Sequence, residues 1–263
     1  YLTEPYAEVT SSGHTLEVGA YDGRDNWEFV KGAERTRQFM KDKGTTTRYG
    51  YVRTDGPDPT RLHDGSYLDG ELMGYAWDAD ATEIADNWRE GLDGIVVHVG
   101  HGERTALQTP WFAATDLPLM DSPTTAHYPL LLNFNCSSGW FDNETDVERT
   151  AAGSLVAHTD TAAASESFCE SALRMQDGGS IASICSIRGS DADYNDDLLT
   201  GVFEAFYPEY PDWEGAPITE DRVYAGLGTA LRAAEFHLLA SVGDNARAQY
   251  HLQSYHLLGD PMM

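Results

Sequence analysis

The chain has 263 residues, 41% of them hydrophobic, and a formal net charge of −26 that comes from 43 acidic and 17 basic side chains. Such an acidic surface repels phosphate backbones, so we expect no nucleic-acid binding. No apolar run reaches the roughly 18 residues that a membrane-spanning helix needs, so we expect no membrane span. The charge would favour cationic peptides, although we attribute most of it to adaptation to a salty environment.

The first half of the chain alternates short apolar runs with amphipathic segments. Its length suits one α/β domain over residues 1–263, and Tyr1 in place of an initiator Met indicates a mature or excised fragment. Strands that alternate with helices predict a mostly parallel sheet. Strands are predicted at His14–Tyr21, 46–52, Ile95–Val99 and Leu130–Phe134, and helices at 27–43 and 81–89.

The second half carries longer connections. Residues 103–128 are predicted to be mostly connection, with Trp111 and Phe112 covering the floor of a site and a helix starting within 112–117. Residues 142–165 are acidic and rich in Ala and Thr, which predicts a long exposed loop. Further helices are predicted at 165–176, 198–206 and 221–242, strands at 180–186 and 250–258, and a polar loop at 188–197.

Reactive side chains follow two of the predicted strands. His101 comes shortly after Val99, and Cys136 shortly after Phe134. Open parallel sheets bind ligands at the carboxyl ends of their strands, so we expect the imidazole and the thiol to meet there. The thiolate is the nucleophilic form of cysteine, and a nearby imidazole can take its proton and later protonate a leaving amine. The N–H groups of Gly102 and Cys136 could form an oxyanion hole.

Simpler interpretations exist for single residues. A lone cysteine with apolar neighbours is about as often a small buried hydrophobe as a nucleophile, and the pairing with His101 is what favours catalysis. His98 and His101 could be taken for a metal pair, but positions i and i+3 of a strand face opposite sides, so His98 is predicted to be a satisfied core histidine. Cys169 and Cys185 are expected in the core, and three cysteines form no disulfide framework.

A set of short motifs carries a family resemblance. They are GHGE at 100–103, NCSSGWFD at 135–142, SFCESALR at 167–174, GGSIA at 178–182 and LLGDP at 257–261. In this order they resemble the gingipain-like cysteine peptidases, a family similar in fold to caspases and legumains. The resemblance implies a three-layer α/β/α caspase-like fold with a mostly parallel central sheet. It also implies a cysteine endopeptidase that acts on protein or peptide substrates through a Cys136–His101 dyad.

The resemblance implies further site residues. A carboxylate at the end of the first sheet strand orients the imidazole in the family, and Asp22 matches that position best. In the arginine-directed relatives an acidic residue before the following helix lines the primary specificity pocket. The corresponding register falls near Phe29, and the adjacent Asp25 and Glu28 are the acidic candidates. Trp111 is a further substrate-binding candidate.

Arg188, in the loop that would frame the same pocket, decides between two specificities. If Asp191 or Asp193 neutralises this cation, the acidic candidates favour cleavage after Arg or Lys. If the guanidinium instead points freely into the pocket, acidic side chains are preferred at the cleavage site. We favour the basic specificity, because a buried cation needs a carboxylate partner.

Further expectations concern bound ions, cellular location and function. We expect no required cofactor, and the resemblance allows a structural calcium ion at the carboxylates of 191–197, although a solvated charge run is preferred. The resemblance implies an extracellular or cell-surface protein. Arg149 marks a candidate processing site, with an ordered surface insertion as the favoured alternative. An endopeptidase is our main hypothesis; a sortase-like transpeptidase of the same family and a non-catalytic binding domain remain alternatives.

Overall fold

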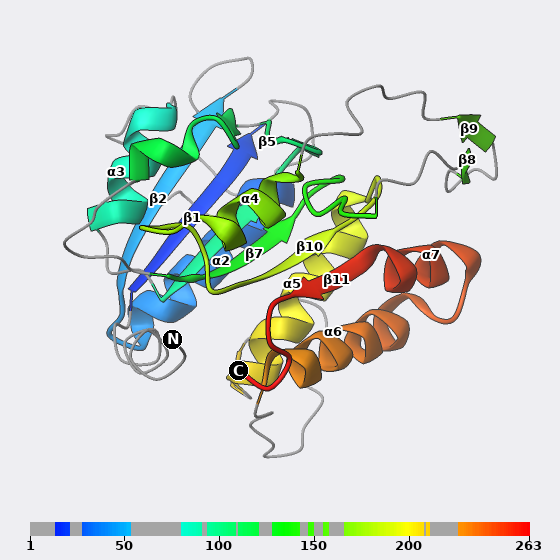
Figure 1. The fold of residues 1–263 in the computed structure, drawn as a ribbon. Coiled ribbons are helices and arrows are strands. Elements are labelled where there is room, and N and C mark those ends of the chain that lie inside the picture. The colour runs from blue at the N-terminus through cyan, green and yellow to red at the C-terminus, as the bar shows by residue number, and fades with distance from the viewer. Residues whose placement is uncertain are drawn as a thin grey trace.

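A six-stranded sheet forms the centre of the molecule in this computed structural model (Figure 1). The strand order is β11-β10-β7-β3-β1-β2; the strands from β10 to β2 run parallel, and β11 is antiparallel to β10. The strands are β1 (His14–Tyr21), β2 (Thr46–Arg53), β3 (Ile95–Val99), β7 (Leu130–Phe134), β10 (Ala182–Ser186) and β11 (Tyr255–Leu258). The structure describes residues 14–21, 28–53, 80–90, 94–108, 110–120, 128–142, 147–149, 155–157, 166–207, 209–210 and 226–263.

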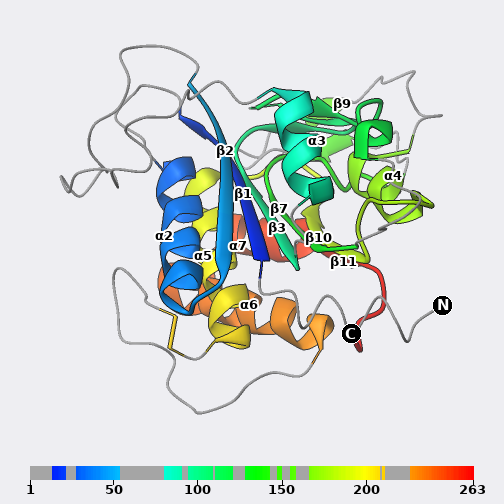
Figure 2. The ribbon, with the colours of Figure 1, turned by 90° about the vertical axis from the view of Figure 1, so that its left-hand side faces the viewer.

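Helices cover both faces of this sheet, as Figure 2 shows. One face carries α2 (Glu28–Asp42), α5 (Ala192–Phe206) and α6 (Leu227–Val242), and the other carries α3 (Ala81–Glu90) and α4 (Phe168–Arg174). The three-layer α/β/α arrangement predicted from the family resemblance is thereby confirmed. Within the described ranges, every helix is too short or too polar to cross a membrane.

Neighbouring residues of each central strand serve different cores. Val97 and Leu132 pack with the α2–α5–α6 layer, whereas Val96 and Leu131 pack with the α3–α4 layer. Successive strand side chains point to opposite faces, and both faces of a parallel sheet are covered. This is why these strands could be recognised as continuous apolar runs with no polar alternation.

The region after β3 differs from the prediction. It forms a small antiparallel sheet of β4 (Gly102–Glu103), β5 (Ala106–Leu107) and β6 (Phe112–Ala113), followed by the 3₁₀ helix η2 (Leu117–Met120). The prediction that a helix starts within 112–117 is therefore wrong for residues 112–116, since β6 occupies the first two and the 3₁₀ helix begins only at Leu117. The Asp116 carboxylate accepts a hydrogen bond from the Ala113 N–H (2.8 Å), a local turn that competes with helix formation.

Two further elements correct the sequence prediction. Helix α5 begins at Ala192, not at 198, so the expected polar loop 188–197 is mostly helix. Its carboxylates lie in the first turns, where the positive end of the helix dipole favours them. The predicted strand 250–258 is divided into α7 (Ala246–Ser254) and β11. The Asn245 side chain caps α7 by accepting from the N–H groups of Arg247 and Ala248.

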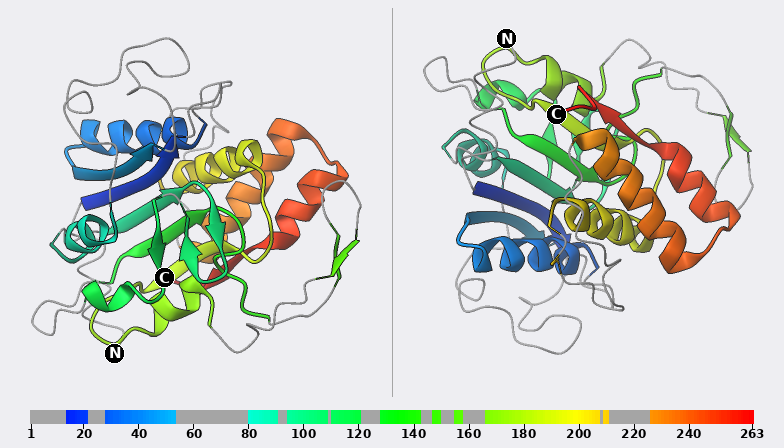
Figure 3. Two further views of the ribbon diagram at one scale, coloured as in Figure 1. Left: turned by 90° about the horizontal axis from the view of Figure 1, so that it is seen from above. Right: turned by 90° about the horizontal axis from the view of Figure 1, so that it is seen from below.

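Two peripheral segments complete the fold. Short strands β8 (Val147–Arg149) and β9 (Leu155–Ala157) pair within the segment expected to be a long loop, set apart from the main sheet (Figure 3). At the other end of the chain, the Leu227 N–H donates to the Met263 carbonyl (2.7 Å), which places the C-terminal residues against the start of α6. Gly259 has φ +130° there, and a Cβ would lie 2.7 Å from the Ala182 side chain.

Candidate active site

The strands that lead to His101 and Cys136 are direct neighbours. β3 and β7 pair in parallel from Ile95↔Leu130 to Val99↔Phe134, and the Gly100 N–H continues the ladder to the Phe134 carbonyl (3.4 Å). The histidine and the cysteine each follow this last aligned pair by the same number of residues. Both therefore leave the same edge of the sheet, as the sequence predicted.

Gly102 brings the two motifs into contact. A Cβ at this position would lie 2.7 Å from the backbone oxygen of Cys136 and 2.7 Å from Cγ of Asn135, so only glycine fits without a shift. The Gln108 N–H donates to the His101 carbonyl (3.0 Å), which makes Gly102 and Leu107 a non-hydrogen-bonded pair of β4 and β5. The Gly102 N–H therefore points away from β5, as an oxyanion donor requires.

The turn after Cys136 is strained and tied to the end of β10. Ser137 has φ +58°, the one non-glycine residue with positive φ in the described ranges. Its N–H donates to the Arg188 carbonyl (2.8 Å), and the Gly139 N–H donates to the Ser186 carbonyl (2.9 Å). Strained residues persist where the surroundings over-determine them, which is typical of functional sites.

A buried polar network supports the turn from inside. The Asn135 amide N–H donates to Nδ1 of His98 (2.8 Å), and the Ser138 hydroxyl donates to Oδ1 of Asn135 (2.6 Å). His98 is fully buried, which confirms it as a satisfied core histidine, while His101 is exposed. In the part of the chain that the structure describes, no group of three or more metal-binding side chains occurs.

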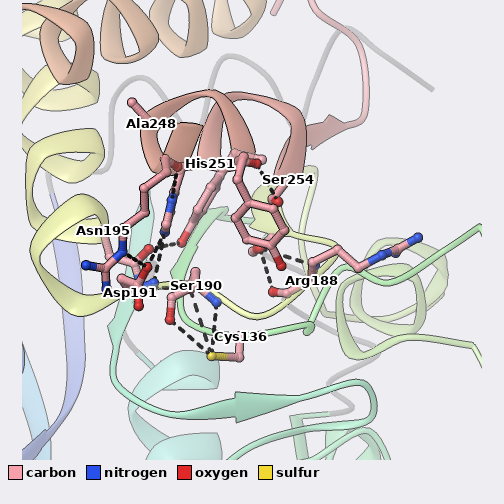
Figure 4. A network of polar contacts seen from close by, with 12 residues as sticks. Cys136, Arg188, Ser190, Asp191, Asn195, Ala248, His251 and Ser254 are labelled. Carbon is pink, nitrogen blue, oxygen red and sulfur yellow. Dashed lines mark hydrogen bonds and ion pairs between the residues drawn. The ribbon is translucent and has the colours of Figure 1, made fainter. Parts of the chain in front are cut away.

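The Cys136 thiol lies against Ser190, in the loop between β10 and α5 (Figure 4). The Ser190 N–H approaches Sγ at 3.3 Å, and the Ser190 carbonyl oxygen lies 3.5 Å from Sγ. Among the described residues, these are the hydrogen-bonding partners of the thiol, and none joins it to His101. The thiol is half-buried, which leaves it reachable for a substrate.

The other two cysteines are core residues, as predicted. Cys169 and Cys185 are free thiols with no exposed surface, both within the α3–α4 core. The hydrogen bond with Cys169, together with burial, raises the pKa of the Cys185 thiol well above its usual value. A thiol held neutral in this way is a poor nucleophile.

Arg188 has a different partner from the two that the sequence offered. Its guanidinium forms a bidentate pair with the Asp142 carboxylate (2.7 and 3.2 Å) and lies 4.9 Å from the ring centroid of Trp140. Asp191 is instead bound to Arg247 (2.6 Å), which holds the pKa of its carboxyl below the usual value. The expectation that Asp191 or Asp193 neutralises Arg188 is therefore wrong in the identity of the carboxylate, although the cation is neutralised.

The structure describes only some of the remaining predicted site residues. Asp22 and Asp25 lie outside the described residues, and Glu28 starts α2 with a side chain that is not described. Trp111 is 53% exposed and follows the turn after β5, so it stays a substrate-binding candidate. Phe112 is fully buried against Phe168 and Trp88, so the idea that it covers the site floor is wrong.

Sequence reasoning named Phe29 only as a register position and missed its contact with His101, and it missed Asn195 and His251 altogether. Phe29 packs edge-on against the His101 ring (centroids 5.1 Å apart), and Asn195 and His251 join the loop around Ser190 to α5 and α7. The capping signal of Asn245 could have revealed α7, and with it the position of His251 on a helix. No local sequence signal announces the Phe29 contact, because it joins two distant segments.

The comparisons with known proteins identify the family of this chain. A family model for Peptidase family C25 matches residues 13–263, and the chain belongs to this family. The resemblance to gingipain-like cysteine peptidases is thereby confirmed. A search of curated proteins found no match.

Solved structures share the fold at low sequence identity. Gingipain R, described as an Arg-specific cysteine proteinase, is similar with a TM-score of 0.65 and 15% identity over 95% of this chain and 46% of its own. The complex of pro- and mature domains of RgpB from Porphyromonas gingivalis gives 0.64 and 14%, over 99% and 53%. A third, described only as a protease, gives 0.59 and 17%, over 100% and 52%. The chain thus spans about half the length of these proteins.

Proposed function

We propose that this chain is the catalytic domain of a cysteine endopeptidase, with Cys136 as nucleophile and His101 as general acid and base. The observation that carries the proposal is the close approach of the two motifs at one sheet edge, where Gly102 packs against the Cys136 carbonyl. Membership of a peptidase family and the strained turn at Ser137 support it.

The reaction follows from the placement of these groups. His101 takes the proton of the Cys136 thiol. The resulting thiolate attacks the scissile carbonyl carbon and forms an S–C bond, while the carbonyl oxygen takes up the negative charge. The N–H groups of Gly102 and Cys136 receive this oxyanion. The C–N bond then breaks as protonated His101 gives its proton to the leaving amine. His101 next takes a proton from water as the water oxygen attacks the thioester carbonyl. The S–C bond then breaks, the acid product leaves, and the proton returns from His101 to the sulfur.

Further parts of the proposal concern residues near this centre. Asp22 orients the His101 imidazole, and Asp25 or Glu28 accepts a cationic substrate side chain. The pair between Arg188 and Asp142 supports cleavage after Arg or Lys, because this guanidinium carries no uncompensated charge toward a substrate. Peptide substrates, an extracellular or cell-surface location and a structural calcium ion, with no required cofactor, belong to the same proposal.

Replacement of single cysteines tests the function. We expect Cys136→Ala to abolish cleavage of a mixed peptide library, while Cys169→Ala retains most of it and serves as the matched control. Product analysis with and without an added amine separates hydrolysis from transpeptidation, since only a transpeptidase joins the amine to the acyl fragment. Full activity of Cys136→Ala would overturn the proposal.

A further inference from the structure

The loop against the Cys136 thiol contains a built hydrogen-bond donor for the thiolate. We propose that the Ser190 N–H stabilises the Cys136 thiolate, and that Asn195 and Tyr255 are positioning residues that hold this donor through the Ser190 hydroxyl. The inference rests on the proposed role of Cys136 as nucleophile. Its test reads the thiol directly and does not require peptidase activity.

Ser190 places one backbone donor and one backbone acceptor close to the thiol (Figure 4). Its N–H lies 3.3 Å from Sγ of Cys136, and its carbonyl oxygen lies 3.5 Å away. The neutral thiol can donate its S–H to this carbonyl, but the thiolate gains only from the N–H. A hydrogen bond to the charged form of an acid favours ionisation, so the distance of the N–H affects how much thiolate is present.

The proton of the Ser190 hydroxyl is donated to a partner other than the thiol. The hydroxyl donates to the Asn135 carbonyl (2.9 Å) and accepts from the Asn195 amide (2.9 Å). A hydroxyl has one proton, so its 4.0 Å contact with the Cys136 sulfur is no hydrogen bond. The hydroxyl instead ties the loop to the backbone immediately before the cysteine, and this fixes the N–H opposite the sulfur.

Tyr255 completes the chain of contacts from the rigid sheet. Its buried hydroxyl donates to Oδ1 of Asn195 (2.7 Å), which fixes the direction in which the amide of Asn195 points. The Tyr255 ring stacks on Phe134 (centroids 5.7 Å apart), and Tyr255 lies opposite Ser186 in the β10–β11 ladder. Both partners are the last residues of their strands, so the network begins on fixed backbone.

A second anchor holds the residue that follows Ser190. The Asp191 N–H donates to Nε2 of His251 (2.9 Å), and Nδ1 of His251 lies 2.8 Å from the Arg247 carbonyl. Since Nε2 accepts, the proton is on Nδ1 and is donated to that carbonyl. The backbone around Ser190 is thus held by α5 on one side and by α7 on the other.

The chain offers a matched control for Tyr255. Tyr210 is equally buried, and its hydroxyl accepts from Nε of Arg35 (3.0 Å) and pairs with Oγ1 of Thr36 (2.9 Å). Tyr255→Phe and Tyr210→Phe each remove one buried phenolic hydroxyl from a satisfied network. The two differ in that the Tyr255 network ends on the thiol, whereas the Tyr210 network joins α2 and α5.

The test measures iodoacetamide alkylation of the folded protein against pH, with the Cys136 peptide quantified by mass spectrometry. We expect Tyr255→Phe to move the midpoint of this profile upward by about half a pH unit, which is about threefold less thiolate below the midpoint. Ser190→Ala should move it by about one unit, or about tenfold. Tyr210→Phe should leave the midpoint in place while its thermal stability falls.

Wild-type midpoints in both Tyr255→Phe and Ser190→Ala would overturn the inference, as would an equal shift in Tyr210→Phe. If Tyr255→Phe does not fold, Ser190→Ala decides by the same measurement. If the wild-type protein cleaves no peptide but the shifts occur, the proposed function fails and the donor role of Ser190 stands.

Discussion

Neighbouring residues of α5 serve two buried polar networks with different uses. Asn195 belongs to the thiol network, which comprises Cys136, Ser190, Asn195 and Tyr255. Asp196 belongs to the remote network, which comprises Arg35, Thr36, Asp196, Thr200 and Tyr210. Each network joins segments far apart in the sequence, but only the first ends on a reactive atom.

In the remote network the charge of the Arg35 guanidinium is neutralised by the carboxylate of Asp196. The Arg35 guanidinium donates to both Asp196 oxygens (2.9 and 3.2 Å) and to the Tyr210 hydroxyl (3.0 Å). Burial works to lower the pKa of Arg35, but Tyr210 and Asp196 together raise it above its usual value, so the residue stays charged. We propose that one of these similar networks stabilises a helix pair, whereas the other supports the Cys136 thiolate.

The largest expected effect is a loss of folding stability when the remote network alone is broken. Asp196→Ala leaves the buried Arg35 charge without its carboxylate and should lower the free energy of unfolding by about 3 kcal/mol, measured by urea denaturation. The alkylation profile of Cys136 should not move. The exposed Asp193→Ala on the same helix is the control and should cost less than about 1 kcal/mol. Equal losses in the two variants would contradict the role assigned to the pair.

Adding a methyl group at Gly102 tests the region around the thiol without removing any polar group. Gly102→Ala places a methyl group 2.7 Å from the Cys136 carbonyl and should cost about 1–3 kcal/mol of stability. Since the shift occurs beside the proposed oxyanion hole, we expect kcat to fall by at least about tenfold. The control is Gly243→Ala, where φ is +77° and the Cβ meets open space, so backbone strain arises far from the thiol. Comparable kcat values in the two variants would contradict the placement of the oxyanion donor.

The smallest expected effect is a loss of folding stability at acidic pH that depends on His251. Burial lowers the pKa of His251 below its usual value, against raising contributions from the Arg247 carbonyl and the Asp191 carboxylate. The fold thus prefers neutral His251, and the stability it contributes is complete above about pH 6.5 and is lost as the pH falls through the folded pKa. Urea denaturation at pH 7.5 and 5.5 should show a smaller loss for His251→Gln than for wild type. An equal loss in both proteins would show that His251 does not carry this dependence.

Much of the site could be predicted because it depends on strand topology. Successive residues of β3 and β7 are buried whichever face of the sheet they point to, so both strands stand out in the sequence as apolar runs. Their parallel pairing brings His101 and Cys136 to one edge of the sheet. The partners of the loop after β10 could not be predicted in the same way. Asp191 binds Arg247 across 56 residues, and Arg188 binds Asp142 across 46. Local charge patterns do not identify such pairs, because the packing of α7 and the turn after Cys136 decides them.

The most direct test of the account is labelling with a thiol-directed peptide probe, followed by mass spectrometry of the modified peptide. We predict that the wild-type protein is labelled at Cys136, and that His101→Ala slows labelling by about a hundredfold or more, since general base assistance is lost. Labelling at the buried Cys169 or Cys185, or equal rates in wild type and His101→Ala, would contradict a Cys136–His101 dyad.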